Sequence, residues 1–248
     1  MGVAIITGAS SGLGSAYVDA VLDGFPEIEE IWLVARREER LREVARRHPD
    51  KRFEIIPADL ARKEGWQALE AKLVEKRPGV WLLINDAGLC RGGSFEGSRL
   101  DDLLAMIDLN CKGLTAVTHI CLPYLAQGST IIEVASTSAF VPNTGLVAYS
   151  ATKSYVQALA LGLREELRPR DINVCAVCPG MMETEMTTNP TVRQAWLPRV
   201  NVARAAAKSL AAARAGRAVH TTDAFYKGYR LLAKLAPHTL LVKFAGLG

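Results

Sequence analysis

Short apolar runs rich in β-branched residues alternate along the chain with longer segments of mixed character. Some longer segments, such as EERLREVARRH (38–48) and WQALEAKLVEKR (66–77), repeat their apolar residues at helical spacing. Apolar strands separated by helices are typical of a parallel sheet covered on both faces. The pattern predicts an α/β, doubly wound Rossmann fold whose central parallel sheet has about seven strands. The expected strands are residues 3–7, 31–35, 53–57, 80–85, 130–135, 172–178 and, more weakly, 217–221.

This alternation stops after Pro179, where GMMETEMTTNPTVRQAWLPRV has neither a clear strand pattern nor a long helical one. We expect residues 181–200 to form a loop or lid with short helices, and residues 222–248 to form an apolar, partly helical tail. No repeat, low-complexity tract or linker interrupts the sequence. Residues 1–248 are therefore expected to form a single domain.

The composition narrows the possible functions. The chain has 248 residues, of which 49% are hydrophobic and 23% charged, as in a globular protein. Its net charge of +4 comes from scattered basic residues, so nucleic-acid binding is not favoured. No apolar run reaches the roughly 18 residues that a membrane-spanning helix needs. The four histidines are dispersed, and we expect no metal site.

The cysteines point to a reducing compartment. They are five in number, and no secretory leader precedes the first strand-like run, which favours reduced thiols in a cytoplasmic protein. Cys175 and Cys178 form a CxxC, but no second ligand pair at zinc spacing accompanies them. We expect both to be buried strand residues.

A glycine-rich turn, IITGASSGLGSA, follows the first expected strand and opens a helix. Gly8, Gly12 and Gly14 permit a backbone that approaches a pyrophosphate, and the helix N-terminus then meets the phosphate charge. The spacing is GxxxGxG rather than GxGxxG, and no lysine follows as it would in a P-loop. In this position the turn predicts a dinucleotide site, although a purely structural turn is the alternative.

Two arginines follow the second expected strand, where an acidic residue would bind the ribose 2′-hydroxyl of NAD(H). Arg36 and Arg37 could instead pair with a 2′-phosphate, which favours NADP(H) over NAD(H). The alternative is that the arginines belong to a solvated helix start.

Tyr149 and Lys153 are four residues apart in NTGLVAYSATKSYV, so they share one face of the expected helix. A nearby cation favours the phenolate form of a tyrosine, and the pair could therefore transfer a proton. The alternative is an ordinary exposed helical turn, because Tyr-x-x-x-Lys is common by chance.

In sequence order these motifs resemble those of the short-chain dehydrogenase/reductase family, from residue 3 to about residue 186. One departure is Asp86, where the family more often has asparagine. The matching motifs are TGASSGLG (7–14), ADL (58–60), NDAG (85–88), Asn110 in IDLNCKG, Ser136 in EVASTSAF, YSATK (149–153) and CPGMMET (178–184).

The resemblance implies an oxidoreductase in which Tyr149 is the general acid/base and Lys153 lowers its pKa and binds the nicotinamide ribose. Ser136 would hold the substrate oxygen, and Asn110 would complete a water path to Lys153. Ser138 is the alternative serine, but the spacing of 13 residues before Tyr149 favours Ser136. The expected cofactor contacts are Gly8, Ser10, Ser11, Gly12, Leu13, Gly14, Arg36, Arg37, Asp59, Leu60, Asn85, Ala87, Gly88, Tyr149, Lys153, Pro179, Gly180, Met182 and Thr184.

The substrate is expected to be a bulky, apolar alcohol or ketone, with a hydroxysteroid or bile acid favoured and a 3-oxoacyl chain as the alternative. This expectation depends on the apolar residues of the loops around the site, because methionines make adaptable apolar walls. The expected substrate contacts are Ser136, Phe140, Leu146, Tyr149, Met181 and Met186.

Other expectations concern partners and rival functions. The resemblance implies a homodimer or homotetramer through the helices beginning near Leu109 and Tyr149. The basic, apolar tail could lie on a membrane surface, but packing on its own domain or on a neighbouring subunit is favoured. A non-catalytic NADP(H)-sensing protein is the rival of another class, although the catalytic-type residues are all present. A sugar-nucleotide epimerase is disfavoured by the glycine spacing and the short remainder after Pro179.

Overall fold

The computed structural model describes residues 2–188 and 197–246. In these residues a single sheet of seven parallel strands has the order β3-β2-β1-β4-β5-β6-β7, which confirms the expected doubly wound Rossmann fold. The order reverses at β1, so β1 and β4 flank the crevice at the carboxyl ends of the strands. The strands are β1 (Gly2–Thr7), β2 (Ile28–Ala35), β3 (Arg52–Pro57), β4 (Gly79–Asn85), β5 (Leu125–Val134), β6 (Asn173–Cys178) and β7 (Val219–Thr221).

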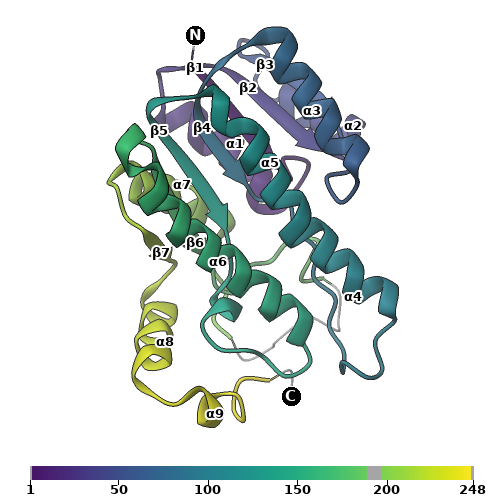
Figure 1. Cartoon of the computed structure of the whole chain (residues 1–248), viewed down its shortest axis with the longest axis vertical. Helices are drawn as coiled ribbons and strands as arrows, with labels where there is room; N and C mark the ends of the chain where they lie inside the picture. The colour runs from purple at the N-terminus through teal and green to yellow at the C-terminus, as the bar shows by residue number, and fades with distance from the viewer. Residues whose placement is uncertain (1, 189–196, 247–248) are drawn as a thin grey trace.

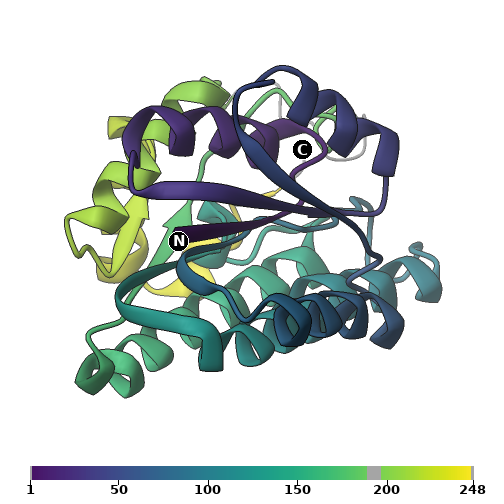
Figure 2. The same ribbon diagram turned by 90° about the horizontal axis from the view of Figure 1, so that it is seen from above.

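Helices cover both faces of the sheet (Figures 1 and 2). One core cluster joins the sheet to α1 (Gly12–Gly24), α2 (Glu38–Arg46) and α7 (Val202–Arg214). A second cluster joins the opposite face to α3 (Lys63–Lys76), α5 (Leu114–Cys121) and α6 (Val147–Leu167). The central strands are buried on both sides, which is why their sequences are apolar throughout rather than alternating.

Short irregular helical turns lie at both the carboxyl and the amino edge of the sheet. A π-helical turn, Asp108–Gly113, joins α4 (Leu100–Ile107) to α5, and short 3₁₀ turns occupy Leu122–Tyr124, Thr137–Ala139 and Arg168–Arg170. After β6 the described chain has no helix or strand until α7, apart from a bridge between Met182 and Val200. Of the expected loop or lid over 181–200, residues 189–196 lie outside the described part.

The tail forms α8 (Ala224–Leu235) and α9 (His238–Leu241), which lie beyond β7 at one end of the molecule (Figure 1). The chain then returns to the segment before α6, where the Thr144 amide donates to the Ala245 carbonyl at 2.9 Å. The tail therefore packs on its own chain, at the carboxyl edge of the sheet. No described helix is long and apolar enough to cross a bilayer.

Candidate active site

The glycine turn joins β1 to α1 in the conformation that its sequence requires. Gly8 and Gly12 have φ angles of +70° and +55°, which favour glycine, and the Gly8 amide donates to Val34 O at 2.8 Å. A Cβ at Gly14 would lie 2.3 Å from the Gly8 carbonyl oxygen, so Gly14 lets the helix pack on the turn. The first turn of a helix has backbone amides without helical partners, and Gly12 and Leu13 of this turn line the crevice, as a pyrophosphate site needs.

A cavity of about 620 Å³ opens at the carboxyl ends of the strands. We call its two regions the turn side, which the segments after β1 to β4 line, and the tail side, which residues 181–187, α8 and residues 241–245 line. Of the expected contacts, those that line the cavity are Gly8, Ser10, Ser11, Gly12, Leu13, Arg36, Arg37, Asp59, Leu60, Ala87, Gly88, Ser136, Leu146, Tyr149, Lys153, Pro179, Gly180, Met181, Met182, Thr184 and Met186.

Three expected site residues lie behind the cavity wall instead. Gly14 packs against the turn, as described above. The buried Asn85 side chain points between β4 and α5, where Nδ2 donates to Thr118 Oγ1 at 2.9 Å and to Glu133 Oε1 at 3.2 Å. Asn110 is also fully buried, in the π-helical turn. Asn85 thus links the end of β4 to side chains of α5 and β5, and neither asparagine lines the cavity.

Phe140, an expected substrate contact, corrects the sequence analysis. The 3₁₀ turn Thr137–Ala139 carries it away from the cavity into a core cluster with Val141 and Val156. There its ring lies 6.4 Å from the Tyr229 ring and 5.9 Å from the Arg230 guanidinium. Phe140 therefore packs against α8 and does not line the cavity.

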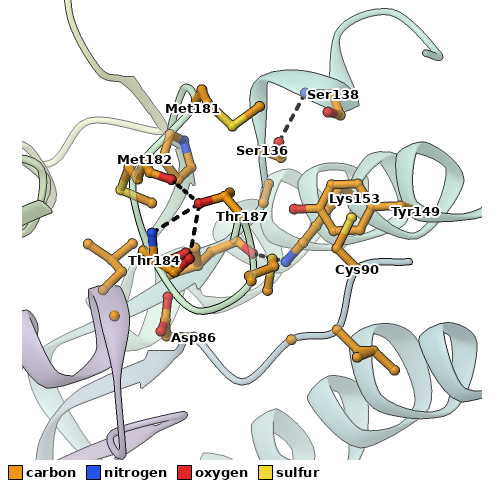
Figure 3. A pocket seen from close by; sticks show the side chains of 18 of the residues that line it. Asp86, Cys90, Ser136, Ser138, Tyr149, Lys153, Met181, Met182, Thr184 and Thr187 are labelled. Atoms are coloured by element: carbon orange, nitrogen blue, oxygen red, sulfur yellow. Dashed lines mark hydrogen bonds between the residues drawn. The ribbon is translucent and has the colours of Figure 1, made fainter. Parts of the chain in front are cut away.

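Ser136, Tyr149 and Lys153 converge at the centre of the cavity (Figure 3). Ser136 follows β5, and its Oγ accepts the Ser138 amide at 3.1 Å. Tyr149 and Lys153 occupy successive turns of α6, with Lys153 Nζ 5.9 Å from the centroid of the tyrosine ring. Nζ donates to the Val134 carbonyl at 2.7 Å, which fixes the ammonium beneath the crevice.

Burial dominates the protonation of this cluster. It raises the pKa of the Tyr149 phenol, an effect that the nearby Cys90 reinforces and the Ser136 side chain opposes. It also lowers the pKa of Lys153, against the attraction of Asp86. The expectation that Lys153 lowers the tyrosine pKa thus meets a larger, opposite effect, because the phenolate would lose its hydration. The phenol is protonated at neutral pH and can donate its proton.

Asn110 braces the backbone beside this cluster. Its Oδ1 accepts the Leu89 amide and its Nδ2 donates to the Leu89 carbonyl, both at 2.8 Å. Nδ2 also donates to Thr152 Oγ1 at 3.0 Å. A Cβ at Gly88 would lie 3.5 Å from both Asn110 Oδ1 and Lys153 Nζ, so both of these groups lie beside Gly88. π-Helical turns often occur at functional sites, and this one brings the amide to the loop after β4.

Asp86 lies under the glycine turn, with Oδ2 2.9 Å from where a Cβ of Gly14 would be. Burial raises the pKa of its carboxyl to about 7, although Lys153 acts in the opposite direction. The residue that departs from the family pattern is therefore a titratable group at the cavity.

The two arginines after β2 have different surroundings. Arg37 donates to Ser10 Oγ at 3.3 Å and to Ser11 Oγ at 3.0 Å, and it pairs with Glu185 at 2.8 Å. This ion pair bridges the turn side and the loop after β6, and it lowers the pKa of Glu185. Arg36 is exposed at the cavity edge. Both arginines line the cavity next to the end of β2.

The tail side contains residues that the sequence analysis did not identify. The apolar helical pattern of the tail is the one sequence feature that could have indicated these residues. The sequence does not show that the tail folds back over the site. The newly identified lining residues from this part of the chain are Phe225, Tyr226, Tyr229, Leu232, Leu241, Phe244 and Ala245.

The residues present fit a dinucleotide rather than a metal ion. Among the described residues, no cluster of three or more histidine, cysteine or acidic side chains could hold a metal. The five cysteines are free thiols, with Cys175 and Cys178 buried in β6 as expected. The glycine turn, the start of α1 and the two arginines supply amides and positive charge for phosphates.

Comparison with known proteins identifies the family. The short chain dehydrogenase family model matches residues 2–195. An oxidoreductase of Staphylococcus aureus (strain USA300) is 31% identical over 201 residues, which are 79% of this chain and 86% of that protein. The chain therefore belongs to the short-chain dehydrogenase family, and it is an oxidoreductase.

Solved structures of this family are also similar. A short-chain dehydrogenase from Sphingobium yanoikuyae, in complex with NADPH, has a TM-score of 0.80 and 28% identity, covering 96% of this chain and 97% of that one. A bulky-bulky ketone specific alcohol dehydrogenase from Comamonas testosteroni has a TM-score of 0.75 and 26% identity, covering 94% and 92%.

Proposed function

We propose that the protein is an NADP(H)-dependent oxidoreductase that interconverts a secondary alcohol and a ketone on a bulky apolar substrate, of hydroxysteroid or bile-acid type. The observation that carries this proposal is the convergence of Ser136, Tyr149 and Lys153 in a cavity whose tail side is mostly apolar. The Sphingobium structure, a complex with NADPH, and the Comamonas enzyme, specific for bulky ketones, support the cofactor and the substrate class.

The choice of NADP(H) depends on the end of β2. No acidic residue is present there to accept a ribose 2′-hydroxyl, whereas Arg36 and Arg37 can form charge-assisted bonds to a 2′-phosphate. Because Glu185 and two serines already engage Arg37, the exposed Arg36 is the better candidate for the phosphate.

The bound nicotinamide supplies or accepts the hydride at the substrate carbon. In the direction of reduction, Tyr149 donates its phenolic proton to the carbonyl oxygen, and Ser136 Oγ donates a hydrogen bond to the same oxygen. Lys153 stabilises the phenolate that results, while its bond to Val134 O holds it in place. Burial keeps the phenol protonated before reduction. In the oxidation direction the phenolate form of Tyr149, beside the Lys153 ammonium, accepts the proton of the substrate hydroxyl.

The test begins with fluorescence titration by NADPH and NADH, followed by a turnover screen over steroids, bile acids and acyl carbonyls. We expect tighter binding of NADPH and turnover of a polycyclic substrate. Turnover of 3-oxoacyl substrates alone would replace the substrate proposal. Tight NADPH binding without turnover of any class would favour a cofactor-sensing role.

We also propose a cytoplasmic homo-oligomer. The expected interface is formed by the helices that begin near Leu109 and Tyr149. Helix α4, which leads into the first of these, and α6 present exposed apolar side chains, including Leu104, Ile107 and Tyr155, as a helix–helix interface would need. Light scattering on the purified protein should give a dimer or tetramer, and Leu104→Glu with Ile107→Glu should lower the mass. Fractionation of cells tests the location.

A further inference from the structure

The tail exposes an unusual concentration of large apolar side chains. Leu231, Leu235, Leu240 and Phe244 are between 54% and 82% exposed, within fourteen residues of one another. In α8, Leu231 and Leu235 are one helical turn apart, so they form a continuous apolar stripe on the outer face. On the inner face, Tyr226 and Ala233 are buried against the protein.

Basic residues accompany this stripe. Lys227 and Lys234 lie at the positions of α8 that flank Leu231, and Lys243 precedes Phe244. Residues 224–248 contain no aspartate or glutamate, while they contain three lysines and one arginine. The tail thus carries a charge of +4, which equals the net charge of the whole chain.

The same segment forms the wall of the cavity. Phe225, Leu232 and Phe244 line the cavity and are also 48%, 49% and 82% exposed. Apolar side chains therefore continue from the outer face of α8 to the inside of the cavity. Figure 1 shows α8 and α9 projecting at one end of the molecule, away from the helices that cover the sheet.

We infer that this face, which consists of α8, α9 and residues 242–246, docks on an anionic phospholipid surface and turns the cavity toward the lipid. An interfacial helix needs an apolar stripe that enters the acyl boundary and lysines that meet the headgroups. The tail has both, and its uniform positive charge complements phosphatidylserine or phosphatidylglycerol. A lipophilic substrate could then pass between the bilayer and the cavity without crossing water.

The experiment is co-sedimentation of the full-length protein with vesicles of phosphatidylcholine alone or mixed with phosphatidylserine. We expect binding to the mixed vesicles that weakens as salt is raised. Leu231→Gln with Leu235→Gln should weaken it at least about tenfold. Lys227→Gln with Lys234→Gln should weaken it by a factor of about twenty-five, at roughly fivefold per lysine.

Matched controls are Val74→Gln on α3 and Lys63→Gln, which change similarly exposed positions on another face and should leave vesicle binding unchanged. Leu231 and Leu235 do not line the cavity, so cofactor binding should survive and report correct folding. Leu235→Trp adds a direct readout, since its emission should shift to the blue only with mixed vesicles.

Three results would overturn the inference. One is the absence of vesicle binding, and another is binding that the leucine and lysine pairs do not affect. The third is a lower molar mass for the leucine pair in light scattering without vesicles, which would mean that a second copy of the chain covers this face.

Discussion

The turn side and the tail side of the cavity are built from different kinds of sequence. On the turn side, each contact lies within a few residues of a strand end, and a short motif sets its backbone, as Gly8 and Gly12 do with positive φ angles. On the tail side, the contacts come from the loop after β6 and from the last 25 residues of the chain. A pairing between Thr144 and Gly246 joins the end of the tail to the segment before α6.

This difference separates two tasks. The phosphates and the nicotinamide of a dinucleotide are the same in every enzyme that uses them, so fixed amides, arginines and a buried lysine suit them. Substrates differ, and apolar side chains on late segments can vary without disturbing the sheet. The largest effects should therefore come from the groups at the junction of the two sides, and the smallest from the outer tail.

Tyr149→Phe should have the largest effect, because it removes the proton donor at this junction and leaves the ring in place. We expect kcat to fall about a thousandfold. The dissociation constant for NADPH should change little, since Lys153 keeps its bond to Val134 O. Steady-state turnover and fluorescence titration measure the two quantities.

Ser136→Ala and Ser138→Ala form the matched pair for this experiment. The former should lower kcat strongly and the latter only slightly, because Ser138 contributes its amide rather than its hydroxyl to Ser136. Comparable turnover in Tyr149→Phe and the unmodified enzyme would show that Tyr149 is not the proton donor.

Arg36→Ala tests whether the Arg36 side chain, on the turn side, binds the 2′-phosphate of NADPH. Loss of one charge-assisted bond should raise the KM for NADPH about ten- to a hundredfold and leave the KM for NADH nearly unchanged. Arg37→Ala should affect both cofactors, because its bonds to Ser10 and Ser11 hold the turn itself. Equal changes for the two cofactors in Arg36→Ala would assign phosphate recognition elsewhere.

The raised pKa of Asp86 predicts that cofactor binding depends on pH. Its pKa is raised to about 7, so the carboxyl is neutral below that pH and becomes an anion beside the phosphate turn above it. We expect the dissociation constant for NADPH to rise as pH increases from 6 to 8, by about tenfold at most per pH unit. Asp86→Asn should flatten this dependence.

Other groups that face Asp86 define the control. Tyr17 on α1 and Tyr149 on α6 have raised pKa values and stay neutral over this range, whereas burial lowers the pKa of Lys153. A pH dependence that persists unchanged in Asp86→Asn would mean that a group other than Asp86 causes it, and Lys153 would be tested next. Isothermal titration in two buffers of different ionisation enthalpy would count the protons taken up.

The sequence predicted the seven strands and most of the turn side, since strand periodicity and glycine spacing act within a few residues. It erred at Asn85 and Phe140, which face inward from a strand end and a 3₁₀ turn. Which way such a side chain points depends on the helix packed above it. The return of Ala245 to Thr144 joins segments about a hundred residues apart, and no local pattern specifies it.

Phe244→Ala tests the tail side, where the smallest effect is expected. Phe244 lines the cavity but is 82% exposed, so its replacement by alanine removes only part of the apolar contact with the substrate. We expect the KM for a polycyclic substrate to rise about two- to fivefold, with kcat and the KM for NADPH nearly unchanged. Leu241→Ala, at a less exposed position of the same wall, should have a somewhat larger effect of the same kind. A small ketone should be insensitive to both changes, because it would fill only the region near Ser136 and Tyr149. If the KM for NADPH rose in parallel, the tail would contribute to the cofactor site, and the division between the two sides would fail.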